Sequence, residues 1–297
     1  MNAMNIFNKI ALQNLRKNRA RTFATIVGVI LSTALLTGIV CFVVSLQNYM
    51  VSGAIEKYGD WEIAFTNADQ EFIQSQEKDS RVKNIVSFSN IGYARLSTGK
   101  NPDKPYAFLA GFNDETLDVL PLTLISGRMP ENEQEVVIPS HLASNGGVRL
   151  SIGDSVSFEV GQRVKTNGQV LSQDTAYLHE KEKLINTETR TYTVVGICQR
   201  PSFEDVSSPG YTLITKSSAD ITPQNETAFV GLNNPADVRD FMADGDSNIL
   251  LNDNVLRFLG LSEDTFFNTL LYTVVVILVA IVLIGSVCLI YLSLIHI

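Results

Sequence analysis

The sequence predicts an α+β membrane protein, in which two transmembrane helices flank an extracytoplasmic mixed α/β domain with an inserted β-rich lobe. Three observations predict this arrangement. Two long apolar runs, residues 22–46 and 266–297, contain no Asp, Glu, Lys or Arg. All 31 acidic residues lie between these runs. Five basic residues and no acidic residue precede the first run.

Both apolar runs are long enough to cross a bilayer. A helix rises about 1.5 Å per residue and the hydrocarbon core is about 30 Å thick, so about 20 residues suffice. A cleaved signal peptide is the alternative interpretation of the first run, but its apolar region is typically about 7–15 residues long. Residues 22–46 exceed that length, which favours a retained transmembrane helix.

The basic flank predicts the orientation of the chain. Positive residues concentrate on the cytoplasmic side of membrane proteins, so residues 1–21 are predicted to be cytoplasmic and residues 47–264 extracytoplasmic. Apolar residues at helical spacing suggest an amphipathic helix on the membrane lipid, although an ordinary basic flank fits too. The expected location is the cell (cytoplasmic) membrane, as a multi-pass protein. The basic residues that carry this prediction are Lys9, Arg16, Lys17, Arg19 and Arg21.

Composition excludes several classes of function. Residues 47–264 carry 18 basic and 31 acidic residues, a formal charge of 18 − 31 = −13, which disfavours nucleic acid as a partner. Cys198 is the only cysteine between the apolar runs, so this part of the chain cannot form an internal disulfide. Neither run contains the charged residues that mark ion pathways.

The extracytoplasmic part is predicted to begin and end with helices that continue the membrane spans as stalks. Residues 47–120 and 216–264 alternate helical and strand patterns, whereas residues 121–215 are mostly β. The segment 166–188 is predicted to be a hairpin tip or a flexible loop. The residues predicted to couple movement through the two stalks are Tyr49, Ile55, Leu256 and Leu259.

No catalytic, cofactor-binding or metal-binding residue is predicted. The sequence has no GxxxxGK[ST] phosphate loop and no GxSxG nucleophile motif. His141 and His179, the histidines of the extracytoplasmic part, have no second ligand at zinc-binding spacing. His179 is interpreted as a solvated surface residue beside Glu180. The chain is therefore not predicted to be an enzyme.

The segment 120–158 carries an ordered motif: Gly-Arg and a proline, an acid before a β run, and Gly-Asp before another strand. A later strand, residues 192–197, ends in Val-Gly-Ile. Together with the layout of the spans, this motif resembles the FtsX-like and MacB-like permease family of ABC transporters. Turn geometry is the expected role of its glycines. The motif residues are Gly127, Arg128, Pro130, Glu135, Gly153, Asp154 and Gly196.

The resemblance implies a permease that works as a homodimer or paired permease with a separate cytoplasmic ABC ATPase. ATP hydrolysis would move an extracytoplasmic domain that exports or acts on a peptide, lipoprotein, drug or cell-wall enzyme. Such permeases typically have four membrane helices, so the sequence is expected to be truncated in its second span. The alternative is a two-span receptor or sensor that binds an extracytoplasmic ligand; a membrane-anchored hydrolase lacks a nucleophile and base in the sequence.

Overall fold

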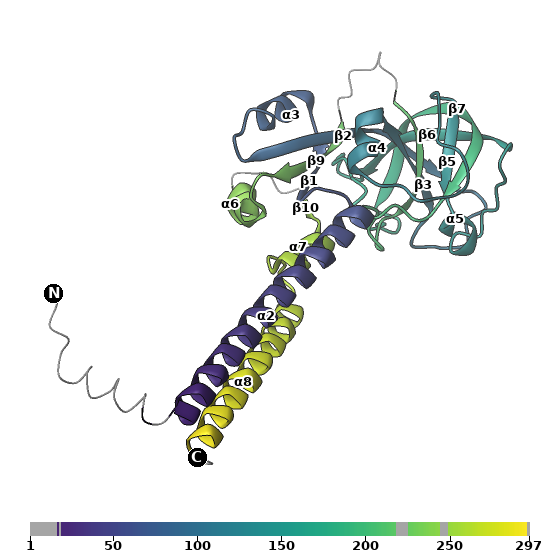
Figure 1. The fold of residues 1–297 in the computed structure, drawn as a ribbon. Helices are drawn as coiled ribbons and strands as arrows, with labels where there is room; N and C mark the ends of the chain where they lie inside the picture. Colours follow the sequence, from purple (N-terminus) through teal and green to yellow (C-terminus); the bar gives the residue numbers. More distant parts are fainter. Residues whose placement is uncertain (1–16, 18, 218–224, 244–248, 296–297) are drawn as a thin grey trace. The chain divides into compact units, whose positions relative to one another are not determined.

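The computed structural model describes residues 17, 19–217, 225–243 and 249–295. The predicted amphipathic helix lies largely outside these residues. The chain divides into two compact units, residues 1–50 with 262–297 and residues 51–261. Figure 1 shows the fold, coloured along the sequence from purple at the N-terminus to yellow at the C-terminus.

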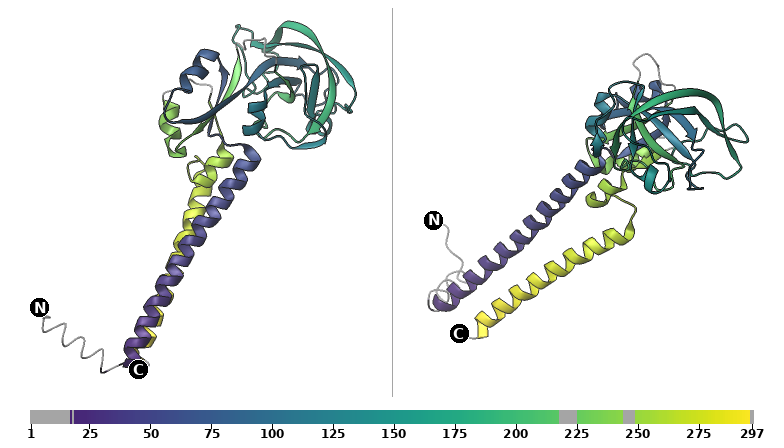
Figure 2. Two further views of the ribbon diagram at one scale, coloured as in Figure 1. Left: turned by 45° about the horizontal axis from the view of Figure 1, so that its top comes forward. Right: turned by 90° about the vertical axis from the view of Figure 1, so that its right-hand side faces the viewer.

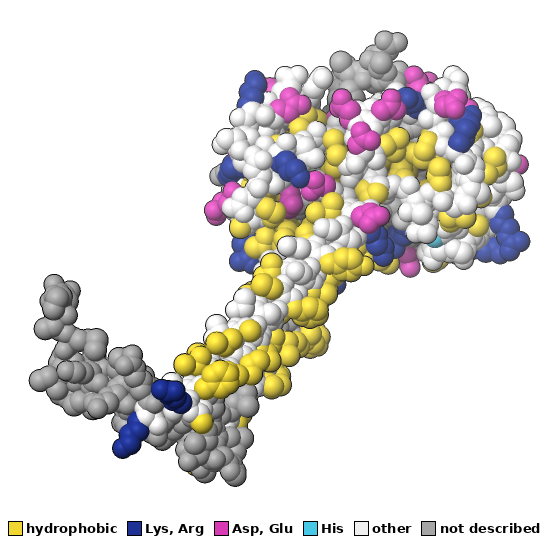
Figure 3. Space-filling view, viewed as in Figure 1, with side chains coloured by type: hydrophobic (Ala, Val, Ile, Leu, Met, Phe, Trp, Pro, Cys, Tyr) yellow, Lys and Arg dark blue, Asp and Glu magenta, His cyan; other side chains and the backbone are white. Residues whose placement is uncertain are grey.

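Two long apolar helices confirm the predicted membrane-protein fold class. They are α2 (Arg19–Tyr58) and α8 (Thr265–Ile295), and Thr25–Tyr58 and Thr265–Cys288 are long and apolar enough to cross a membrane. Their apolar side chains are largely exposed, as Figure 3 shows in yellow for the face in view. The hydroxyls of Ser32 and Thr33 donate to carbonyl oxygens four residues earlier. Their hydrogen bonds are therefore satisfied within the helix, as a lipid environment requires.

Six strands of residues 51–261 form a closed ring, which Figures 1 and 2 show as a barrel. The pairing order is β2–β3–β8–β5–β7–β6, and β6 pairs again with β2. A short strand, β4 (Leu124–Gly127), pairs with residues 196–198 of β7, on the edge opposite β5. Buried apolar residues such as Val136, Val194 and Leu213 form the barrel core. The barrel strands are β2 (Val82–Arg95), β3 (Tyr106–Phe112), β5 (Glu135–Pro139), β6 (Ser155–Lys165), β7 (Glu182–Cys198) and β8 (Gly210–Lys216).

A smaller antiparallel sheet has the strand order β10–β1–β9–β2. Helices pack against it, and the contact between them forms a second apolar core. Phe72, Phe241 and Leu256 from three helices pack with strand residues such as Ile63 and Val230. The strands are β1 (Ile63–Ala68), β9 (Glu226–Leu232) and β10 (Ile249–Leu251). Besides the end of α2, the helices in the described part of this unit are α3 (Gln70–Gln76), α4 (Asp114–Val119), α5 (His141–Ser144), η1 (Pro235–Asp237), α6 (Val238–Ala243) and α7 (Asp253–Leu259).

Strand β2 belongs to both sheets. Its first half pairs with β9 and its second half with β3, and the register shifts between Asn90 and Gly92. Phe88, in the first half, packs against Phe229 of the small sheet and against Phe112 and Phe203 on the barrel side. One aromatic core therefore joins the two sheets.

Two predicted boundaries differ from the structure. The β-rich lobe predicted at residues 121–215 omits β2 and β3, which complete the barrel by pairing with strands distant in sequence. The segment 166–188, predicted to be a hairpin tip or flexible loop, begins as a connection and becomes strand from Glu182. Residues 182–188 pair with β6, but most of their side chains are exposed and polar. The sequence therefore lacks the alternation of apolar and polar residues that predicts a strand.

Candidate functional site

The motif residues singled out in the sequence gather around strand β7. Gly127 lies opposite Gly196 in the β4–β7 pair. Gly127 has φ +81°, and a Cβ there would collide with the carbonyl oxygen of Val195, while a Cβ at Gly196 would press on the backbone of Arg128. The two glycines therefore allow β4 to approach β7 closely.

The charged motif residues fix the turns beside this glycine pair. Arg128 donates from Nη1 to Glu135 Oε2 at 2.7 Å, and Glu135 also accepts the Glu131 backbone N–H at 2.8 Å. Asp154 accepts the Ser151 N–H at 2.8 Å and closes the turn that contains Gly153, whose φ is +96°. These hydrogen bonds hold the turns that flank the glycine pair.

Replacing Gly127 with alanine is expected to destabilise the domain by about 1–3 kcal/mol, because alanine resists a positive φ and its Cβ has no space. Gly168 is the matched control: it has φ +88°, but a Cβ at this position would meet no atom within 4 Å. Gly168→Ala should cost about 1 kcal/mol. Urea unfolding measures both variants, and equal losses would contradict the close approach at Gly127.

The Arg128–Glu135 pair is expected to make stability depend on acid pH. The hydrogen bond from Arg128 lowers the pKa of Glu135 to about 2, from an ordinary value of about 4.3. A lowered folded-state pKa gives stability that is complete above about pH 4.3 and is lost as the pH falls toward 2. The stability gap between wild type and Arg128→Met should therefore narrow between pH 5 and pH 2. A gap that stays constant over this range would contradict the assignment.

The end of helix α2 is built into the small sheet. The Trp61 indole N–H donates to the Tyr58 carbonyl at 2.9 Å, and the Asn252 side-chain amide donates to the Trp61 carbonyl at 3.0 Å. Gly59, with φ +97°, turns the chain where a side chain would strike the Val119 carbonyl oxygen. Ala54, in the last two turns, is 4% exposed. We call Ala54, Tyr58, Gly59, Trp61 and Asn252 the α2 joint.

Glu62 adds a buried charge next to the α2 joint. Its side chain accepts the backbone N–H of Leu232 at 2.7 Å, and its backbone carbonyl accepts the N–H of Asn252. Burial raises the pKa of Glu62, against the opposing effect of the Leu232 hydrogen bond. The joint is therefore held by strands β1 and β9 and by the segment before α7.

The four predicted stalk residues occupy different environments. Tyr49 is 77% exposed on α2, and Ile55 is half-buried two turns later. Leu256 is fully buried in the core of the small sheet, and Leu259 packs against that core. Helix α7 ends at Gly260, which adopts the left-handed conformation, and α8 begins only at Thr265. The predicted second stalk is therefore not one continuous helix, because α7 is part of the domain core.

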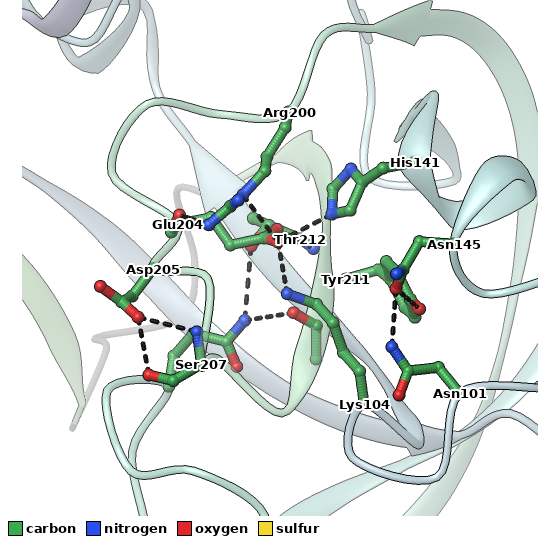
Figure 4. A network of polar contacts seen from close by, with 12 residues as sticks. Asn101, Lys104, His141, Asn145, Arg200, Glu204, Asp205, Ser207, Tyr211 and Thr212 are labelled. Atoms are coloured by element: carbon green, nitrogen blue, oxygen red, sulfur yellow. Dashed lines mark hydrogen bonds and ion pairs between the residues drawn. The ribbon is translucent and has the colours of Figure 1, made fainter.

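Sequence reasoning missed a buried polar network, shown in Figure 4. The Glu204 carboxylate is fully buried and accepts from Lys104 Nζ at 2.7 Å and from the Thr212 N–H at 2.8 Å; it lies 2.8 Å from His141 Nε2. Burial alone would raise the pKa of Glu204, but His141 and Lys104 outweigh it and lower the pKa. The network fixes the segment around Arg200 against the barrel.

A second missed pair lies at the barrel's edge. The side chains of Arg163 and Glu182 are both fully buried and are joined by two hydrogen bonds of 2.8–2.9 Å. The Arg163 guanidinium also lies over the rings of Tyr93 and Tyr106 and donates to the carbonyl oxygens of Ser172 and Thr175. These bonds pack the connection between β6 and β7. No local sequence pattern predicts this pair. The only signal in the sequence is that an Arg and a Glu stand on either side of a polar connection.

The two histidines that the structure describes have different partners. His141 belongs to the Glu204 network, whereas His179 is exposed and contacts Asp103 at 3.0 Å rather than Glu180. Within the part of the chain that the structure describes, no group of three His, Cys, Asp or Glu residues could hold a metal ion.

Comparison with known proteins identifies the domain. The family model described as "MacB-like periplasmic core domain" matches residues 22–245. Comparison with curated protein sequences finds no match. Two solved structures are similar at 11% identity: the extracellular domain of the noncanonic ABC-type transporter YknZ from Gram-positive bacteria, and a domain of a putative permease from Porphyromonas gingivalis. Each covers 64% of this chain, over 98% and 86% of their own lengths, with TM-scores of 0.31 and 0.32.

Both scores are below 0.5, so neither neighbour adds to what the family match establishes. That match spans most of the chain, including the β4–β7 motif cluster, the barrel and the end of α2. The family resemblance predicted from the motif residues is therefore confirmed. The chain belongs to the family of proteins with a MacB-like periplasmic core domain.

Proposed function

We propose that this chain is the permease subunit of an ABC transporter, and that a separate cytoplasmic ATPase drives movement of its extracytoplasmic domain. The family match supports a permease. The observation that carries the coupling proposal is helix α2, whose 40 residues run without a break from Arg19 to Tyr58. At about 1.5 Å per residue it is about 60 Å long, twice the thickness of the hydrocarbon core.

An unbroken helix transmits displacement better than a flexible linker, and α2 ends in the α2 joint rather than in a loop. Helix α8, by contrast, is separated from α7 by residues 260–264. In this proposal α2 is the transmitting element and the second connection accommodates the movement. The N-terminus lies in the cytoplasm, where the ATPase acts, and residues 51–261 lie outside.

Affinity purification of the full chain from its own host tests the proposal. We expect an ATPase with a phosphate-loop motif to co-purify with the chain. We also expect the amount of crosslinking between the domain and its extracytoplasmic partners to differ between the ATP-bound and nucleotide-free states of that ATPase. A chain that binds a ligand through its domain, but associates with no ATPase, would instead support the two-span receptor.

A further inference from the structure

The barrel has a gap in its wall between strands β2 and β6. These strands pair only at Tyr93–Gly161 and Ala94–Val160, and then separate. Residues 95–98 and 156–159 line the two sides of the resulting groove, whose volume is about 770 Å³. We call this space the β2–β6 groove.

One side of the groove is an open strand edge. The Val194 N–H donates to the Asp154 carbonyl, so the backbone groups of residues 154, 156 and 158 face β7 and those of 155, 157 and 159 face away from it. Among the described residues, no strand pairs with residues 155–159 on that side. An unpaired edge of this kind is a template for another strand.

The inner surface of the groove is apolar. Val156 and Phe158 are half-buried and pack against the barrel core, and Leu96, Val148 and Leu150 do the same. A strand placed in the gap would present every second side chain to these residues. The groove therefore favours an occupant with apolar residues at alternate positions.

The rim of the groove has an excess of positive charge, in contrast to the acidic domain. Arg95 and Lys183 are exposed, and neither has an acidic partner within hydrogen-bonding or ion-pair distance in the described chain. Glu182 also lines the groove, but its charge is matched by Arg163, which leaves Glu159 as the exposed acid. Acidic residues on the outward side of the occupant would complement this rim.

We propose that the β2–β6 groove binds an extended peptide segment of a partner, which adds as a strand to β6 and carries apolar and acidic residues in alternation. Backbone hydrogen bonds to residues 155, 157 and 159 would supply affinity, and the apolar lining would select the side chains. The proposal does not depend on the ATPase, because strand addition requires only the folded domain.

The test uses the full chain in lipid nanodiscs and a fluorescein-labelled nine-residue peptide of alternating valine and glutamate. Ser157→Pro removes a backbone N–H that faces the groove, at an edge position that tolerates proline. Ser157→Ala is the matched control, because both variants lose the hydroxyl contact with Thr191 but alanine keeps the N–H. Fluorescence anisotropy measures the affinity of each protein for the peptide.

We expect saturable binding to wild type and Ser157→Ala, at least tenfold weaker binding to Ser157→Pro, and several-fold weaker binding to Arg95→Glu. Hydrogen exchange should slow at the amides of residues 155, 157 and 159 when peptide is bound. If Ser157→Pro fails to fold, a peptide methylated at every second backbone nitrogen removes the complementary hydrogen bonds, which the peptide N–H groups would donate to the carbonyl oxygens of residues 155, 157 and 159.

Three outcomes would overturn the proposal. One is equal binding to the proline and alanine variants or to the methylated peptide. Another is no saturable binding to wild type. The third is a wild-type dimer that Ser157→Pro dissociates, which would make a second copy of this chain the occupant.

Discussion

Replacing Tyr49 with proline is expected to uncouple ATP hydrolysis from movement of the domain. Proline in a helix interior removes a backbone hydrogen bond and costs about 3 kcal/mol, so it would break α2 within the segment proposed to transmit displacement. Tyr49 is 77% exposed, and little packing is lost with its side chain. We expect the amount of extracytoplasmic partner that crosslinks to the domain per ATP hydrolysed to fall at least tenfold. The ATPase activity should be retained and the domain should stay folded.

Tyr49→Ala is the control, because alanine removes the same ring but favours the helix. It should retain coupling, measured with the reconstituted permease and ATPase. The equivalent proline at Leu256 is not a test of coupling. Leu256 is fully buried in the small-sheet core, so Leu256→Pro is expected to unfold the domain instead. Normal coupling in Tyr49→Pro would contradict transmission through α2.

Replacing Arg163 with methionine is expected to produce the largest loss of stability, about 3–5 kcal/mol, because it leaves the fully buried carboxylate of Glu182 without its partner. The variant also loses the bonds that pack the β6–β7 connection and the contacts with two tyrosine rings. Trp61, the single tryptophan, is 5% exposed and reports unfolding by fluorescence. Denaturant titration of the full chain gives the free energy of unfolding.

Arg190→Met is the matched control on the same hairpin. Arg190 pairs with the largely exposed Glu188 at 3.2 Å, and its loss should cost less than about 1 kcal/mol. Replacing both Arg163 and Glu182 with methionine should recover part of the lost stability, since no charge is then stranded. Equal losses in Arg163→Met and Arg190→Met would show that the buried pair contributes no more than a surface pair.

Local patterns predicted much of the fold. The two apolar helices, the alternation of helix and strand in residues 59–120, and the glycine turns at Gly127 and Gly153 depend on composition and spacing over a few residues. For the same reason, the ordered motif sufficed to indicate the family.

Pairing between distant segments could not be predicted in the same way. Closure of the barrel depends on β2 meeting β6, and β3 pairs in parallel with β8 about 100 residues later. Glu204 meets Lys104 across 100 residues of sequence, so nothing in its neighbourhood marks it as a buried charge. The short helix predicted before the second span is α7, but it does not continue into that span, because the left-handed Gly260 ends it.

The central claim is that the domain lies outside the cytoplasmic membrane while the basic N-terminal flank lies inside. Lys17→Cys and Val206→Cys, both at exposed positions, test it in a chain with Cys41 and Cys288 replaced by alanine. Cys198 can remain, since burial excludes reagent and raises its thiol pKa to about 12. In cells with an intact cytoplasmic membrane, a membrane-impermeant maleimide should label Val206→Cys and leave Lys17→Cys unlabelled until the cells are opened. Labelling of Lys17→Cys from outside, or protection of Val206→Cys, would contradict the account.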